Sequence, residues 1–397
     1  MKIMQRRSVI VSAKRTPIGA FQGHLSSLSA SDLASACIKE ILNHTSIHAE
    51  SINEVILGNV LSAGQGQAPA RQATLKSGCP DSVESLTINK MCGSGLKAVM
   101  LADQAIRCGD TQMIVAGGME SMSNAPYLLN NVRMGQKLGH GQVIDSMIHD
   151  GLWDVYNDKH MGNCAETLAK DRGYTRKSQD EYAIESYNRA KAATSDGIFK
   201  TEIVPIEMPQ RKGNPLLVDQ DEEPNRARFD KIPNLRPAFE EGGTITAANA
   251  SKLNDGAAAL LITSEENAKH LGLDILASIT GQASASHQPE WFTTAPGKAI
   301  NKVLSKTNLK PDDIDLWEIN EAFSVVTMAA MDDFKIKHDK VNIYGGAIAL
   351  GHPIGASGAR ILTTLINAMT RQNAKKGLAS LCIGGGEASA IIIERYD

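Results

Sequence analysis

The segment 92–106 reads CGSGLKAVMLADQAI, a glycine-rich turn followed at once by a helix that is apolar around most of its circumference. A helix without a continuous polar face is buried between other elements, because a surface helix keeps one side for water. A second segment repeats this arrangement, since residues 357–369 read SGARILTTLINAM and also follow a glycine-rich turn. Each helix precedes a short apolar segment that runs into glycines, at 117–118 and at 384–386.

We interpret this repeat as an internal duplication. Two buried helices that face each other between two sheets would form a layered α-β-α-β-α sandwich. The rest of the first part supports an α/β fold, because apolar strands alternate there with helices. The expected strands are 8–12, 54–58, 83–88 and 113–116, and the expected helices are 31–42 and 95–108.

The chain is expected to consist of two halves and an insertion. We place the N-terminal half at 1–121 and 247–272, an inserted loop domain at 122–246, and the C-terminal half at 273–397. The insertion is rich in Met, Asn, Gly, Pro and charge, with helices expected at 164–172 and 178–195. Loops of this length tend to be functional or to mediate assembly.

The composition excludes several classes of function. Of the 397 residues 42% are hydrophobic, and the formal net charge is -3, so no basic footprint for nucleic acid or an anionic membrane surface is expected. The low aromatic content of 4% argues against base-stacking platforms. No apolar run reaches the length that spans a membrane. The sequence therefore predicts a globular protein that binds neither nucleic acid nor a membrane.

The six cysteines indicate reduced thiols. None lies in a Cys-x-x-Cys motif or in zinc-finger spacing, so no metal site is expected. An even number could form three disulfides, but a chain of this length without a secretory signal builds its own core. We therefore expect a cytoplasmic protein with free thiols.

Two cysteines and one histidine lie in glycine-rich turns. Cys92 stands between a strand and a buried helix, where peptide dipoles favour an anion and raise the thiolate fraction without saturating it. A neighbouring base is therefore expected, and His352, between Gly351 and Pro353, is the natural candidate. Taken alone, Cys92 would more often be a small buried residue and His352 a structural turn residue. The shared context of turn and buried helix favours a thiol-based acyl-transfer site.

Cys382 precedes three glycines, whose N–H groups could face a developing oxyanion. A second cysteine is more than a hydrolase needs, so it suits acyl transfer to one thiol followed by proton abstraction by another group. Asn320 follows an expected strand at 315–319 and could hold a water or donate to an oxyanion. For Asn320, a helix N-cap is the commoner interpretation.

Together these segments resemble the thiolase family, and its acetyl-CoA acetyltransferase branch in particular. The resemblance covers nearly the whole chain and rests on several motifs in order, none of which decides it alone. The motifs are VIVSAKRTPIG at 9–19, CGSGL at 92–96, AGGMESM at 116–122, HMG at 160–162, NAS at 249–251, NEAF at 320–323, GHP at 351–353 and CIGGG at 382–386.

The resemblance implies a fold, a reaction and roles for the site residues. The fold would be a five-layered α-β-α-β-α sandwich made from a duplicated βαβαβαββ unit with an inserted loop domain. The reaction would be the reversible Claisen condensation of two acetyl-CoA to acetoacetyl-CoA and CoA through an acyl-cysteine. Cys92 would carry the acyl group with His352 as its base, and Cys382 would move the α-proton. One thioester oxygen would lie between His352 and a water held by Asn320, and the other between the N–H groups of Cys92 and Gly384.

The resemblance also implies how substrates bind and how subunits assemble. CoA thioesters would be the substrates, without a metal or prosthetic group, and the insertion would supply most of the CoA site. His160 and Ser251 would line the pantetheine channel, Phe292 would lie near the acyl pocket, and Phe323 would be a further substrate-binding residue. The symmetric dimers and tetramers of the family, together with the long loop 123–146, predict a homotetramer built as a dimer of dimers.

Four residues at three places in the chain depart from the family pattern. Cys164, which might face the site, stands where Thr is usual, Glu387 and Ala388 stand where Met-Gly is common, and Phe292 takes the place of a Met near the acyl pocket. These departures leave the four catalytic residues in place but leave the acyl-chain preference open. The arginine that contacts the CoA phosphates is not identified, with Arg226 and Arg228 as candidates.

Alternative functions differ in what they require of the site. A 3-ketoacyl-CoA thiolase of broader chain length in fatty-acid degradation would use the same catalytic residues. A decarboxylating ketosynthase is disfavoured, because its chemistry does not need Cys382. A non-catalytic acyl-CoA- or lipid-binding protein on the same fold would be expected to lose one of the four residues, and none is lost.

Overall fold

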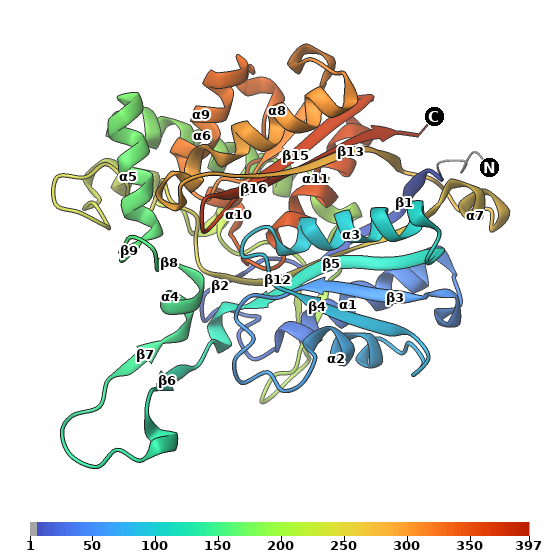
Figure 1. Ribbon diagram of the computed structural model, residues 1–397, viewed down its shortest axis with the longest axis horizontal. Coiled ribbons are helices and arrows are strands. Elements are labelled where there is room, and N and C mark those ends of the chain that lie inside the picture. Colours follow the sequence, from blue (N-terminus) through green and yellow to red (C-terminus); the bar gives the residue numbers. More distant parts are fainter. Residues whose placement is uncertain (1–5, 397) are drawn as a thin grey trace.

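The computed structural model describes residues 6–396 and places five strands of the N-terminal half side by side (Figure 1). Strands β3 and β4 are parallel to each other, and β3 is also parallel to β5. Strand β12 then pairs antiparallel with both β5 and β1. Their bounds are β1 (Ser8–Arg15), β3 (Glu54–Gly58), β4 (Glu84–Ile88), β5 (Met113–Ser121) and β12 (Asn254–Ser264).

The C-terminal half repeats this pattern. Its strands run in the order β14-β15-β16-β13, with β14 parallel to β15 and the other neighbours antiparallel. A parallel bridge from Trp317 to Val341 stands where the counterpart of β4 would lie. The bounds are β13 (Ala277–Ser286), β14 (Leu316–Ile319), β15 (Lys376–Ile383) and β16 (Glu387–Arg395). The expected duplication of an α/β unit is therefore present.

The two halves share a sheet edge. We expected two separate sheets, but β1 pairs with β13 through Val9 with Ser278 and Ile10 with Ala277. The short strand β2 (Gly19–Ala20) pairs with β12, so ten strands form one continuous sheet in the part of the chain that the structure describes. The pairing follows from strand chemistry, because an edge strand exposes unpaired N–H and C=O groups that another strand can satisfy.

Helices fill the middle of the sandwich and cover both outer faces. Figure 1 shows α3 and α11 between the strands of the two halves, with α1 and α2 below and α8 and α9 above. This is the five-layered arrangement expected from two buried helices. The helix bounds are α1 (Ala30–Thr45), α2 (Pro69–Lys76), α3 (Ser94–Cys108), α7 (Glu265–His270), α8 (Ala295–Thr307), α9 (Ser324–Phe334), α10 (Ala347–Leu350) and α11 (Ser357–Arg371).

Glycines let the first turns of α3 and α11 touch. A Cβ on Gly95 would lie 2.8 Å from the backbone nitrogen of Ala359, and a Cβ on Gly358 would lie 2.4 Å from that of Leu96. Contacts this short to backbone cannot be relieved by moving a side chain. The crossing therefore brings the two glycine-rich turns that precede these helices close together.

The strand expected at 113–116 does not end at the glycine pair 117–118. Strand β5 continues through it to Ser121, and all nine residues of the strand are buried. A Cβ on Gly117 would lie 2.0 Å from the carbonyl oxygen of Ala258, and one on Gly118 would lie 2.0 Å from that of Gly355. These glycines permit close backbone packing on both sides of β5, and the turn that follows His352 rests directly on them.

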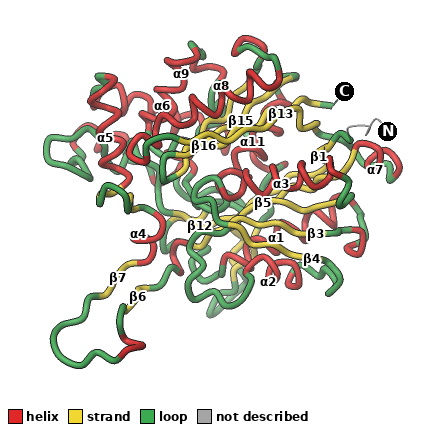
Figure 2. Tube along the Cα trace, in the orientation of Figure 1, coloured by secondary structure: helices red, strands yellow, loops and turns green. Residues whose placement is uncertain are grey.

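The stretch between β5 and β12 leaves the N-terminal half and crosses to the other one. Its helices α5 and α6 pack against α9, and its hairpin β6–β7 extends away from the body of the molecule (Figures 1 and 2). The bounds are β6 (Tyr127–Leu129), β7 (Val143–Asp145), α4 (Ser146–Gly151), β8 (Trp153–Asp154), β9 (Lys159–His160), α5 (Met161–Arg172), α6 (Arg176–Ser195), β10 (Ile206–Met208) and β11 (Leu216–Val218). None of the helices within residues 6–396 has the length and apolar character needed to cross a membrane.

Replacing Gly95 with Ala should destabilise the protein by about 1–3 kcal/mol, because the added methyl group meets the backbone of α11. The matched control is Gly297→Ala in α8, where the new Cβ would find only ordinary contacts, beginning at 3.4 Å from Asp333 Oδ2. That change should be neutral or stabilising, since Ala is the better helix former. Thermal and denaturant unfolding measure both, and equal stabilities for the two variants would contradict the tight crossing.

Candidate active site

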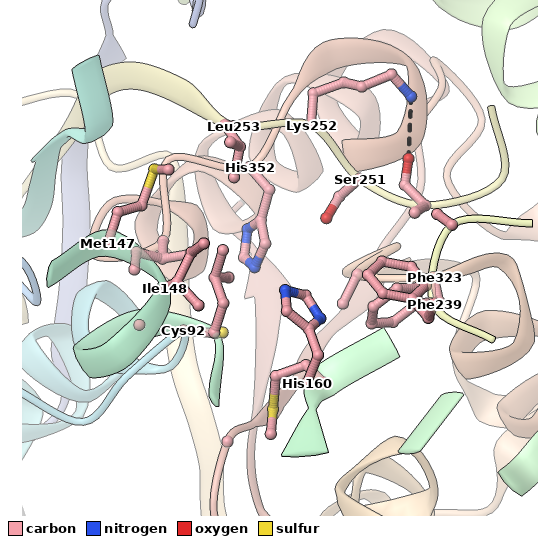
Figure 3. Close-up of a pocket in the computed structure, with 18 of the residues that line it drawn as sticks. Cys92, Met147, Ile148, His160, Phe239, Ser251, Lys252, Leu253, Phe323 and His352 are labelled. Carbon is pink, nitrogen blue, oxygen red and sulfur yellow. Dashed lines mark hydrogen bonds between the residues drawn. The ribbon is translucent and has the colours of Figure 1, made fainter. Parts of the chain in front are cut away.

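A pocket of about 370 Å³ opens where the two halves and the insertion meet (Figure 3). It brings together residues that lie far apart in the sequence. Figure 3 shows the rings of His352 and His160 pointing into the pocket, with the side chain of Cys92 beside them. The wall is mainly apolar with a few polar groups, which is typical of a small-molecule site. Its lining includes Cys92, Met147, Ile148, Leu152, His160, Met161, Phe239, Ser251, Lys252, Phe292, Phe323, His352, Ile354 and Gly384.

Cys92 lies in a tight turn that precedes α3. Met91 before it has a φ of 47°, a left-handed conformation that is uncommon for a residue with a side chain. The turn is held by Ser94, whose Oγ accepts from Lys90 N at 2.8 Å and whose N–H donates to Met91 O at 2.9 Å. Strain of this kind persists only where the surroundings enforce it, and here it fixes the place of the thiol.

The Cys92 thiol is neutral at rest. Burial raises the pKa of Cys92 to about 11, while the backbone N–H groups of Gly384 and of Cys92 itself act in the opposite direction. We expected the helix end to increase the thiolate fraction, but the loss of hydration in the pocket outweighs that effect. Cys92 becomes a nucleophile only when a base removes its proton.

His352 has the protonation that such a base requires. Its Nδ1 lies 2.5 Å from Ser357 Oγ, and the Ser357 hydroxyl donates to Pro353 O at 2.9 Å. Since that hydroxyl has only one proton, Nδ1 must be the donor to Ser357, and Nε2 carries the lone pair. Nε2 has no hydrogen-bond partner among the described residues. Burial, followed by the charge of Arg360, lowers the pKa of His352 to about 3 and keeps the ring neutral.

The second cysteine lies behind the pocket wall. Cys382 is fully buried at the end of β15, in an apolar cluster with Met161, Phe292 and Phe323. Burial raises the pKa of Cys382 well above its usual range, and the charge of a Cys92 thiolate raises it further. Gly384, two residues after Cys382, lines the same pocket as Cys92, so the segment that carries the second thiol borders the site.

Gly384 places an N–H group against Cys92. It follows β15 directly, lines the pocket, and its backbone N–H is near enough to the Cys92 sulfur to act against the rise in the pKa of that thiol. The next two residues, Gly385 and Gly386, have φ values of 91° and 84°, which residues with side chains rarely adopt. A Cβ on Gly386 would also lie 2.4 Å from the carbonyl oxygen of His287. The glycine run is therefore required by the turn that presents this N–H group.

Asn320 has a buried amide without a protein partner. It follows β14, is 1% exposed, and neither its Oδ1 nor its Nδ2 makes a hydrogen bond with the residues that the structure describes. Leaving such a group unpaired costs about 1–3 kcal/mol, so it normally serves a water or a ligand. Asn320 is not an N-cap, because the residue that precedes α9 is Phe323.

His160 and Ser251 line the pocket from the insertion and from the segment that follows it. His160 caps α5, with Nδ1 accepting from Gly162 N at 3.1 Å, so Nε2 carries the proton and can donate to a ligand. Its ring stacks on Phe239 with centroids 4.7 Å apart. Ser251 is held by its N–H, which donates to Ala322 O at 2.9 Å.

The two aromatic residues predicted to bind substrate pack against each other. Phe292 and Phe323 meet edge to face with centroids 6.4 Å apart, and both line the pocket. We had considered that Cys164 might face the site, but its side chain does not line the pocket. Cys164 is fully buried in the apolar cluster that also contains Phe292 and Phe323, and its sulfur lies 3.8 Å from Asp154 Oδ2. Arg226 and Arg228 are exposed side chains outside the pocket wall.

Glu120 is a residue of the site that sequence reasoning missed. Its buried carboxylate accepts from Asn59 Nδ2 at 2.8 Å, from the N–H groups of Val60 and Leu61 at 3.1 Å each, and from Gly355 N at 2.9 Å. Burial raises the pKa of Glu120 to about 7 against the lowering effect of these donors. Glu120 thereby ties the turn that carries His352 to the end of β5. An acid inside an otherwise apolar strand was the signal available in the sequence.

This geometry suits covalent acyl transfer. A neutral thiol faces an imidazole whose lone pair is free, a backbone N–H group lies near the sulfur, and the segment that carries a second thiol borders the site. A nucleophile with an adjacent base and an N–H group for the developing oxyanion is the arrangement that forms thioester intermediates.

Comparison with known proteins agrees with this chemistry. Residues 8–266 match the family model of the thiolase N-terminal domain, and residues 273–395 match that of the thiolase C-terminal domain. The chain is 51% identical to an acetyl-CoA acetyltransferase of Cupriavidus necator over 98% of this chain and 99% of that protein. It is 48% identical to a probable acetyl-CoA acyltransferase of Staphylococcus epidermidis, over 98% and 99% of the two chains.

Solved structures resemble the fold over its whole length. The acetyl-CoA acetyltransferase of Bacillus anthracis superposes with a TM-score of 0.96 at 39% identity, covering 99% of each chain. A thiolase from Ascaris suum in complex with coenzyme A superposes with a TM-score of 0.93 at 44% identity, covering 98% of this chain and 100% of that one.

The neutral resting thiol predicts a distinctive pH dependence of alkylation. Because the pKa of Cys92 is about 11, its thiolate fraction should rise about tenfold per pH unit from pH ~7 to ~10. The rate of Cys92 modification by iodoacetamide, followed by peptide mass spectrometry, should rise in parallel. A plateau below pH ~8 would instead show a thiolate–imidazolium pair at rest and contradict the assignment.

Proposed function

Because this chain belongs to the thiolase family, we propose that it is an acetyl-CoA acetyltransferase, which condenses two acetyl-CoA reversibly to acetoacetyl-CoA and CoA. The observation that carries the proposal is the pocket in which Cys92 and the unpartnered Nε2 of His352 meet, with Cys382 behind them. A hydrolase needs one nucleophile and one base, whereas a condensation also needs a group that removes a carbon-bound proton.

The first half-reaction transfers an acetyl group to Cys92. His352 Nε2 accepts the thiol proton as the sulfur attacks the thioester carbonyl, and the departing CoA thiolate takes that proton from the imidazolium. The carbonyl oxygen gains charge in this step and accepts hydrogen bonds from the N–H groups of Cys92 and Gly384. Removing one donor of an oxyanion hole typically slows a reaction about 10²–10³-fold, so these N–H groups are a major part of the catalysis.

The second half-reaction forms the carbon–carbon bond. His352 accepts the proton of Cys382, and the Cys382 thiolate then removes the α-proton of a second acetyl-CoA. The enolate oxygen lies between the protonated His352 and a water held by the amide of Asn320. The enolate carbon attacks the acetyl group on Cys92, and the Cys92 thiolate leaves and takes the proton from His352. All protons are then accounted for, so the cycle needs neither a metal nor a prosthetic group.

Coenzyme A enters between the insertion and the N-terminal half. The Nε2–H of His160 and the hydroxyl of Ser251 face the channel and serve as polar contacts for the amides of the pantetheine arm. Phe239 and Phe323 supply apolar walls on the same side (Figure 3). In this proposal the insertion 122–246 binds the pantetheine arm of the substrate. The two halves of the fold supply the catalytic residues.

The hairpin β6–β7 is the proposed assembly element. It holds exposed apolar side chains, with Leu138 100%, Met134 83% and Tyr127 67% exposed, and apolar exposure at this density marks an interaction surface. We assign it to contacts between dimers in a homotetramer. A cytoplasmic location completes the proposal, since a catalytic thiol at Cys92 requires the reducing conditions found there.

Thiolysis of acetoacetyl-CoA by CoA tests the proposed reaction. The wild-type protein should consume acetoacetyl-CoA and carry an acetyl group on Cys92 after exposure to acetyl-CoA, as seen by peptide mass spectrometry. Cys382→Ser should retain that label but lose turnover at least ~10²-fold, because a proton transfer step contributes about 10²–10⁴-fold. Absence of both turnover and label in the wild type would refute the proposal. Loss of the label in Cys382→Ser would show that Cys382 acts earlier.

Phe292 is expected to limit acyl length. Phe292→Ala should leave thiolysis of acetoacetyl-CoA within a few-fold of the wild type and improve kcat/KM for six- and eight-carbon 3-ketoacyl-CoA about 10-fold or more, since each methylene buried contributes roughly 0.8 kcal/mol. A chain-length series with both proteins measures this. Good activity of the wild type on the long substrates would favour the broader 3-ketoacyl-CoA thiolase instead.

A further inference from the structure

An ion pair joins the two loops that form the proposed oxyanion site. Lys90, two residues before Cys92, places its Nζ 2.5 Å from Oε2 of Glu387, three residues after Gly384. The two residues are separated by 297 positions, and they belong to opposite halves of the duplicated fold. The pair is partly exposed, with 23% of the Lys90 side chain and 38% of the Glu387 side chain accessible.

Both partners are rigidly attached to the catalytic backbone. The N–H of Lys90 donates to Ser94 Oγ at 2.8 Å, and its carbonyl accepts from Gly93 N at 3.0 Å. Lys90 is therefore part of the same turn as Cys92. On the other side, Glu387 opens β16 and is paired in register with Ile383 across the glycine turn.

The two loops also touch between these attachment points. A Cβ on Gly93 would lie 2.3 Å from Cδ1 of Ile383, so the turn of Cys92 rests directly on the end of β15. The N–H of Gly384, the next residue, lies near the Cys92 sulfur. The distance between the N–H groups of Cys92 and Gly384 is thus set by how closely two loops from different halves are held together.

We propose that Lys90 and Glu387 form a clamp that positions the N–H group of Gly384 against Cys92, so that Glu387 is a positioning residue for acyl transfer. This role rests on the proposed function. The ion pair holds the two loops of the oxyanion site, whereas His160 and Ser251 are held by other contacts, to Gly162 and to Ala322. A misalignment of about 1 Å is enough to reduce a rate by up to ~10²-fold.

The charges around the clamp favour this pairing. Lys97, on the next turn of α3, is near enough for the charge of Lys90 to lower its pKa, after the larger effect of burial. Removing Glu387 would leave two cations beside each other at the rim of the site. Lys90 would then be repelled from its place rather than merely released.

The test compares Lys90→Met, Glu387→Gln and the exchanged pair Lys90→Glu/Glu387→Lys with the wild type. Each single variant should lower kcat for thiolysis roughly 10-fold with KM for CoA within about twofold, and the exchanged pair should recover most of kcat. Raising the ionic strength should slow the wild type more than the single variants, because a partly exposed ion pair is screened by salt.

The matched control is Lys76→Met, which removes an ion pair to Asp32 of similar length, 2.6 Å, with 41% and 38% of the two side chains accessible. This pair joins α1 and α2, whose residues do not line the pocket. The control should match the single variants in thermal stability and leave kcat unchanged. Unchanged kcat in Glu387→Gln, a change confined to KM, or an exchanged pair as slow as the single variants would overturn the clamp.

A readout without substrate separates this inference from the proposed function. The Gly384 N–H stabilises the Cys92 thiolate, so Lys90→Met and Glu387→Gln should each slow iodoacetamide modification of Cys92 about threefold or more at fixed pH. If the wild type fails to turn over acetoacetyl-CoA but shows this difference, the proposed substrate is wrong and the clamp stands. Equal modification rates in all variants would refute the clamp itself.

Discussion

The crossing of two buried helices at glycine is the constraint on which the site depends. Cys92 precedes α3, while His352 precedes α11 and hydrogen-bonds Ser357 at the start of that helix. The contacts of Gly95 with Ala359 and of Gly358 with Leu96 leave no space for a Cβ. Any wider crossing would separate the thiol from its base. Duplication of one structural unit thus provides two helix ends, and close packing turns them into a single reaction centre.

Burial controls the electrostatics of this centre. Moving an ionisable group out of water disfavours its charged form, which raises the pKa of Cys92 and lowers that of His352. The resting pair is therefore neutral, and charge arises only while substrate is being transformed. Hydrogen-bond donors that are already in place, such as the N–H of Gly384, then act on a developing charge without having to reorganise. The hydrogen bond from His352 to Ser357 adds the remaining requirement, since it fixes which nitrogen is free to accept a proton.

The polar interior around the site is organised by backbone as much as by side chains. Glu120 collects N–H groups from the turn that follows β3 and from Gly355, and so holds the His352 turn against β5. Gly118 of β5 allows the backbone of Gly355 in this turn to pack directly against the strand, because it has no Cβ. Lys90 and Glu387 hold the opposite side of the pocket, where two loops from different halves meet. The reacting groups are thus positioned by contacts between halves, which a single half could not provide.

The sequence predicted the fold class, and it named candidate site residues of which the structure brings Cys92, His352 and Gly384 into one pocket. Two apolar helices preceded by glycine turns predicted the buried middle layer, and the placement of Cys92, His352 and Cys382 in such turns marked them as chemical groups. Local pattern is informative here because burial and tight turns restrict which residues a position tolerates. The same local view ended the strand at 116, whereas β5 continues through Gly117 and Gly118 to Ser121, because the sequence alone does not show that these glycines serve close packing.

Tertiary structure decided what depends on distance and dielectric. The burial of Cys92, the unpartnered amide of Asn320 and the role of Glu120 depend on groups that are remote in the chain. The free Nε2 of His352 instead follows from a local hydrogen bond to Ser357, five residues away, and only its burial depends on the tertiary structure. The edge pairing of β1 with β13 is also a result of tertiary structure, because the sequence of neither strand shows which strand it will pair with. The sequence by itself determined which chemical groups are present and which of them lie in tight turns. Packing in the tertiary structure determined how far apart these groups lie and how well they are shielded from water. Those distances and that shielding determine the pKa values and the hydrogen bonds of the site.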